Sequence, residues 1–133
     1  MVKRFGLGVA FLAIVMSATL VIGAPAVAAP SDPFTGVWAS PDTDGDIVTF
    51  AISAPGADGI RHLTGFDPAA EACEGGPATA HGSGTVAGAT LTTTLTVRCG
   101  PTVVFVGSFY FTASGDTLIS NTSLNPYTRV GAQ

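Results

Sequence analysis

The chain has 133 residues, with two cysteines, two histidines and a formal net charge of −4. Two of the five basic residues, Lys3 and Arg4, lie at the start of the chain. Beyond residue 28 the chain contains three arginines, no lysine and nine acidic residues. Nucleic-acid binding and adhesion to an anionic membrane both depend on a basic patch. This composition therefore argues against both functions.

The first 28 residues have the organisation of a secretory signal peptide. Lys3 and Arg4 precede an apolar run from Phe5 to Gly23, and the small residues up to Ala28 supply an A-x-A cleavage site. Cleavage after Ala28 leaves residues 29–133 as a single all-β domain of a secreted, extracellular protein. The alternative is an uncleaved signal anchor. Beyond residue 28 no apolar run is long enough for a membrane-spanning helix.

Short segments of strand character alternate with turn-rich segments along the rest of the chain, which is typical of an all-β fold. The clearest strand lies at residues 89–99, where Leu91, Leu95, Val97 and Cys99 alternate with polar residues. A loop is expected from Asp67 to Pro77. Eight strands are predicted, at residues 35–39, 47–53, 60–66, 78–86, 89–99, 103–112, 117–120 and 124–130.

Eight sequential strands with short links predict an antiparallel up-and-down barrel, because closing the sheet removes its exposed edges. A β-sandwich is the alternative. The strand register is open. Pairing Phe66 with Ala78 would turn His62 and His81 to opposite faces, whereas a shift of one residue would bring the histidines face to face.

Cys73 and Cys99 are the only cysteines in the chain. An even pair in an exported protein predicts one disulfide. For a closed loop of this length, the chain-entropy model gives a stabilisation of about 3–4 kcal/mol. Two free thiols or a metal pair are the alternatives, although no second cysteine pair or His-x-His is present to complete a zinc site.

The two ends of the predicted barrel carry a recognisable pairing. Gly36-Val37-Trp38 begins the first strand, and Arg129 lies near the end of the last. This arrangement resembles the lipocalin-like (calycin) small β-barrels, which include the avidins. The resemblance implies that Trp38 and Arg129 are a barrel-closing pair in a cation–π contact. The chain lacks a helical segment after the last strand and the biotin-site pattern of avidins. It is also similar to uncharacterised small secreted actinobacterial proteins.

Two groups of residues have the chemistry of a site without its full pattern. The first group is a run of alternating carboxylates, as found among calcium ligands: Asp42, Asp44 and Asp46. No glutamate follows at the position that closes an EF-hand loop. A solvated turn is the alternative interpretation of the same residues. His62 and His81 would need a cleft and a carboxylate to act as catalytic groups. Because no nucleophile elbow or phosphate loop is present, enzyme activity, for example as a small hydrolase or isomerase, is the less favoured function. No cofactor is expected.

Apolar residues supply the remaining candidates for a binding site. The first set would line an inner cavity for a small apolar ligand, or fill a packed barrel: Phe50, Phe105, Phe109 and Phe111. The second set forms the other face of the sixth strand and needs a partner, a ligand or another layer: Val104, Val106 and Tyr110. The sequence favours non-enzymatic binding of a small apolar ligand or a partner protein. An inhibitor or adhesion module on a packed barrel is the alternative.

Overall fold

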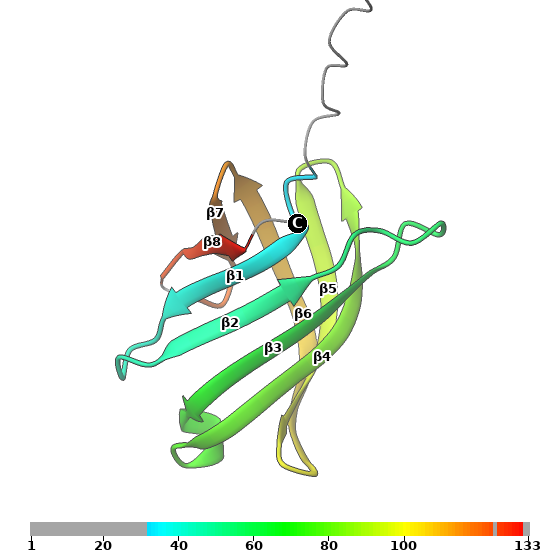
Figure 1. Ribbon diagram of the computed structural model, residues 1–133. Helices are drawn as coiled ribbons and strands as arrows, with labels where there is room; N and C mark the ends of the chain where they lie inside the picture. The colour runs from blue at the N-terminus through cyan, green and yellow to red at the C-terminus, as the bar shows by residue number, and fades with distance from the viewer. Residues whose placement is uncertain (1–31, 124, 132–133) are drawn as a thin grey trace, which may run out of the picture.

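The computed structural model describes residues 32–123 and 125–131. They form eight antiparallel strands that close into one barrel in up-and-down order (Figure 1). The predicted all-β barrel is confirmed, and the β-sandwich alternative is wrong. The predicted signal peptide, residues 1–28, lies outside the described residues. The elements are β1 (Gly36–Pro41), β2 (Ile47–Ile52), β3 (Arg61–Ala70), the 3-10 turn η1 (Glu71–Cys73), β4 (Gly76–Ala87), β5 (Thr90–Cys99), β6 (Thr102–Ser114), β7 (Thr117–Ser120) and β8 (Tyr127–Gly131).

The barrel interior is packed at the end where β1 begins and β8 ends, here called the packed end. On β5, the two-residue period turns Leu91 and Leu95 inward and Thr92 and Thr94 outward, and Thr93 shares the inward face. The largest fully buried side chains are Trp38, Phe34, Phe111, Ile52, Leu63, Leu91, Leu95 and Leu118.

Within the described residues, no helix is long and apolar enough to cross a membrane.

Trp38 and Arg129 are direct neighbours in the ladder between β1 and β8. The guanidinium carbon of Arg129 lies 4.2 Å from the centroid of the Trp38 ring, in cation–π geometry. Trp38 is fully buried, and its indole N–H donates to the carbonyl of Phe34 at 2.9 Å. Arg129 also donates to the carbonyls of Pro33 and Thr35. These contacts fix the segment before β1 across the packed end.

A second arginine holds the same segment. Arg61 is 7 % exposed, forms an ion pair with Asp32 and donates to Thr35 Oγ1 at 2.8 Å. Burial alone would raise the pKa of Asp32. Hydrogen bonds from Arg61, Thr35 and the backbone N–H of Phe34, together with the charge of Arg61, outweigh burial and lower this pKa below its ordinary value.

The third and fourth strands are longer than the sequence predicted, and their register differs. β3 extends to Ala70 and β4 begins at Gly76, so most of the expected loop from Asp67 to Pro77 is strand. Phe66 pairs with Thr79, one residue away from the pairing with Ala78 that the sequence analysis considered. If Phe66 paired with Ala78, the inward residue Leu63 would lie opposite His81. The observed register opposes Leu63 to Gly82 and leaves both histidines exposed on the outer face.

The sixth strand contains an irregularity that the alternating pattern did not show. Val97 of β5 pairs with Phe105, but the next residue, Arg98, pairs with Val103. Val104 is therefore the extra residue of a bulge, and Val103 does not share the face of Phe105 and Phe109, as strict alternation along the strand would require.

The predicted disulfide between Cys73 and Cys99 is confirmed. It joins the end of η1 to the last residue of β5. The connection between β3 and β4 is thereby tied to the neighbouring strand beyond β4, at the end of the barrel opposite the packed end.

A candidate ligand cavity at the open end of the barrel

The half of the barrel opposite the packed end, here called the open end, contains a cavity of about 380 Å³. It exists because the inward residues of β3 and β4 are small in this half: Gly65, Ala70, Ala78 and Ala80. The volume is within the range of about 300–1,000 Å³ that is typical of small-molecule pockets. The interior is therefore packed at one end and hollow at the other.

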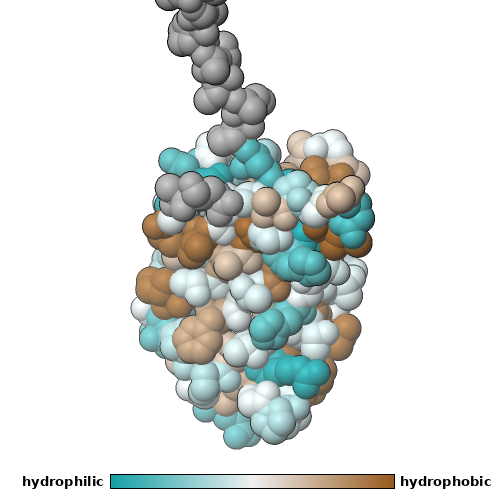
Figure 2. Space-filling model, turned by 45° about the vertical axis from the view of Figure 1, so that its right-hand side comes forward, coloured by the Kyte–Doolittle hydropathy of each residue, from teal (hydrophilic) through white to brown (hydrophobic). Residues whose placement is uncertain are grey.

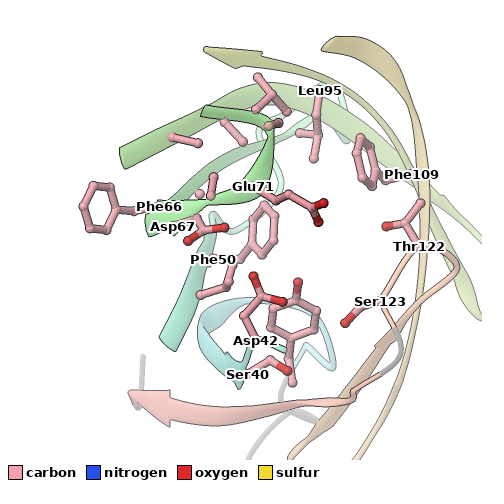
Figure 3. Close-up of a pocket in the computed structure, with 18 of the residues that line it drawn as sticks. Ser40, Asp42, Phe50, Phe66, Asp67, Glu71, Leu95, Phe109, Thr122 and Ser123 are labelled. Carbon is pink, nitrogen blue, oxygen red and sulfur yellow. The ribbon is translucent and has the colours of Figure 1, made fainter. Parts of the chain in front are cut away.

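Apolar and aromatic side chains form the floor and walls of the cavity. Phe50 lies at its centre, and its ring covers Gly65: a Cβ added to Gly65 would stand 2.5 Å from the ring (Figure 3). The Phe50 ring meets Tyr127 edge to face at a centroid distance of 5.5 Å and Phe111 at 6.0 Å. The other large apolar lining residues are Val48, Phe66, Leu95, Val97 and Phe109.

Carboxylates stand around the mouth of the cavity. Asp42 comes from the β1–β2 turn, Asp67 from the end of β3 and Glu71 from η1. Figure 3 shows the three carboxylates around the Phe50 ring, with Asp67 and Glu71 on opposite sides of it and Asp42 below it. We call these three residues the carboxylate rim. The amide of Asn125, which donates to the carbonyl of Pro41, and several hydroxyl groups complete the polar lining. The hydroxyls come from Ser40, Thr43, Thr79, Thr122, Ser123 and Tyr127.

The electrostatic environment of Tyr127 reflects this rim. Burial raises the pKa of the Tyr127 phenol above its ordinary value, and the negative charges of Asp42 and Asp67 raise it further, against an opposing effect of Ser123. The phenol is therefore a neutral hydrogen-bonding group in the wall at neutral pH.

The open end carries most of the protein's negative charge. Alternate turns of an up-and-down barrel lie at the same end, so the β1–β2 and β3–β4 connections come together there (Figure 1). Six of the nine carboxylates belong to these connections or to the end of β3: Asp42, Asp44, Asp46, Asp67, Glu71 and Glu74. Arg98 is also at this end, but it is exposed and donates to the carbonyl of Pro101 at 3.2 Å. Within the described part of the chain, no arginine or histidine side chain lines the cavity.

The four phenylalanines predicted to line a cavity have three different positions. Phe50 and Phe109 are lining residues. Phe111 is 1 % exposed and lies in the packed core. Phe105 is 48 % exposed, folds over Gly107 and meets Phe109 edge to face at 5.7 Å, without reaching the cavity.

The three alternating aspartates and the two histidines singled out from the sequence do not come together, and of these five residues only Asp42 lines the cavity. The carboxylate of Asp42 accepts from the backbone N–H of Thr43, and that of Asp44 accepts from the N–H of Asp46, as in a turn. Among residues 32–123 and 125–131, no three His, Cys, Asp or Glu side chains gather as metal ligands. His62 and His81 are exposed on the outer wall, away from the cavity.

Asp67, Glu71 and Tyr127 are among the lining residues that the sequence prediction missed. No motif joins them, because they lie in different segments of the chain. The available signal was topological: in a predicted meander, every second turn shares one end, and the acidic residues are concentrated in two such turns.

The outer face of β6 is the second candidate site. Val104, Val106 and Tyr110 are 40 %, 60 % and 47 % exposed. β7 pairs with β6 only from Phe111 to Ser114, although β6 is 13 residues long. Figure 2 shows one face of the molecule, on which apolar groups lie among neutral and hydrophilic side chains.

The chain matches no protein-family model, no curated protein and no solved structure. Functional assignment therefore depends on the geometry of the chain itself.

Proposed function

We propose that the protein is a secreted, lipocalin-like binding protein that holds a small molecule with an apolar body in the open-end cavity. The observation that supports this most directly is the 380 Å³ space walled by Phe50, Phe109 and Tyr127. Burial of about 150 Å² of apolar ligand surface there would contribute about 4 kcal/mol, at about 25 cal/mol per Å². The packed end supports the same function, because a rigid scaffold keeps the cavity preformed.

A matched pair of variants tests this function with 1-naphthalenemethanol as a neutral apolar probe. Ala80→Leu places a larger side chain into the cavity from β4, and Ser83→Leu places the same side chain on the outer face of that strand. We expect the probe to bind the wild type and Ser83→Leu equally, and Ala80→Leu at least tenfold more weakly, in a fluorescence titration. Equal binding by all three proteins, or no binding by the wild type, would contradict a role for the cavity.

Among residues 32–123 and 125–131, no strand pairs with the β7 side of β6 before Phe111, and this edge favours a second function, the binding of a protein strand. The N–H and C=O of Tyr110 bond to Asn121, which ends the β7 side of the ladder. Backbone N–H and C=O groups point to alternate sides along a strand. Those of Val106 and Ser108 therefore point to the same side of β6 as those of Tyr110, where β7 no longer pairs with the strand. An uncharged edge flanked by exposed apolar side chains is a template for strand addition.

A second copy of this chain is the occupant of the β6 edge that can be tested first. The segment from Val103 to Tyr110 contains no charge, so two copies would pair without repulsion. Sedimentation equilibrium should show concentration-dependent dimers for the wild type and monomers for Val106→Lys. A wild type that stays monomeric at all concentrations would rule out this pairing, and strand addition would then require a different chain.

A further inference from the structure

We propose that the ligand of the open-end cavity carries a protonated amine, held at the carboxylate rim while its apolar body lies against Phe50. This inference rests on the proposed binding function and names the chemical class of its ligand. It concerns the charge of the molecule, which the apolar walls alone do not determine.

The cavity defines the site, and the carboxylates around it select what enters. Asp42, Asp67 and Glu71 approach the same opening from three separate elements, and Figure 3 shows them around the Phe50 ring. An anionic ligand would meet only like charges at this rim. A cationic group at this opening would face carboxylates, and the described lining contains no arginine or lysine to oppose it.

The hydrogen-bonding groups around the mouth of the cavity are mainly acceptors, which an ammonium group can satisfy as a donor. The carboxylate oxygens only accept hydrogen bonds, and the hydroxyls of Ser40, Thr122 and Ser123 can also accept them. An ammonium group is a donor at each of its N–H bonds. Aromatic faces add to the match, because Phe50, Phe109 and Tyr127 attract a cation through their ring quadrupoles.

The charges elsewhere in the barrel strengthen the preference for a cation. Arg61 and Arg129 are engaged at the packed end by Asp32 and Asp116. At the open end, six carboxylates stand against Arg98, which hydrogen-bonds outside the cavity. The field of the molecule therefore draws cations toward the open end and repels anions from it.

Three probes that share a naphthalene ring and differ only in the charge of the attached group measure the effect of ligand charge on affinity. They are 1-naphthalenemethylamine, which is cationic at pH 7, neutral 1-naphthalenemethanol and anionic 1-naphthoate. Each partly exposed carboxylate contributes about two- to threefold to the affinity for a cation. We therefore expect the amine to bind about tenfold more tightly than the alcohol, and the anion to bind most weakly. The amine's advantage should shrink as salt is raised from 20 mM to 0.5 M.

Variants then assign this advantage to the rim. The triple variant Asp42→Asn, Asp67→Asn and Glu71→Gln keeps the size of each side chain and removes its charge. It should lose most of the amine's advantage over the alcohol, while Asp58→Asn, at the packed end, should retain the wild-type preference. Equal binding of amine and alcohol by the wild type would overturn the inference and leave the proposed function standing. Failure of the wild type to bind any of the three probes would overturn both.

Discussion

Replacement of Trp38 by alanine should be among the most destabilising substitutions in the barrel. The indole is fully buried, and removal of a large core side chain typically costs about 3–5 kcal/mol. Two specific losses place Trp38→Ala in the upper part of that range. The Phe34 carbonyl loses its donor at 2.9 Å, at a cost of about 1 kcal/mol, and Arg129 loses a ring face worth about 1 kcal/mol. We expect a total of about 4–5 kcal/mol, because these contributions overlap.

Urea unfolding followed by far-UV circular dichroism measures this loss without depending on the tryptophan signal. Trp38→Phe is the second variant, since it keeps an aromatic ring and removes the N–H donor. It should lose about 1–2 kcal/mol and remain measurable even if Trp38→Ala does not fold. Ile119→Ala is the control, because Ile119 is 54 % exposed on β7 and should change stability by less than about 0.5 kcal/mol. A loss well under 1 kcal/mol for Trp38→Ala would refute the argument that this residue closes the barrel.

Three further changes have effects that follow from single contacts. Replacing Cys73 and Cys99 together by serine should lower the free energy of unfolding by about 3–4 kcal/mol in urea titrations, and an unchanged midpoint would contradict the tie across the open end. The lowered pKa of Asp32 in the folded state gives stability that is present above its unfolded-state value near 3.8 and is lost as the pH falls through the folded value. Asp32→Asn should therefore reduce stability at pH 7 and flatten its decline in acid, and a parallel decline in both proteins would argue against this linkage. Gly65→Ala should displace the Phe50 ring and destabilise the barrel by about 1–3 kcal/mol, which thermal unfolding would detect.

The number and order of the strands could be predicted because alternation is a local signal that a barrel does not disturb. On β5, Leu91, Leu95 and Val97 face inward together with Thr93, and Thr92, Thr94 and Thr96 face outward, as the alternation indicates. The register of β3 against β4 had no comparable signal, because β4 turns only small residues such as Ala78 and Ala80 inward. Burial of Leu63 away from His81 decides that register, and this depends on two strands at once.

The candidate site was only partly predictable for a related reason. Phe50 and Phe109 were accessible to sequence reasoning because aromatic residues at inward positions are candidates for a cavity wall. Phe105 has the same parity as Phe109, but it turns onto Gly107 near the bulge, and no local pattern shows this. The small residues that create the cavity carry little hydrophobic signal. Their effect appears only when the opposite wall is also known.

Ala80→Leu offers a final test that joins stability to binding. Three added carbon atoms in existing space would contribute about 2 kcal/mol of apolar burial, against about 0.5–1 kcal/mol of side-chain entropy. If the cavity is open space rather than a gap needed by its neighbours, the variant should be more stable by about 1 kcal/mol and should lose the probe. A variant destabilised by more than 1 kcal/mol would show that Ala80 is required by packing against Val97 on β5. A variant that is more stable but does not bind the probe would mean that the small residues in this half of the barrel keep the binding cavity open at the cost of stability.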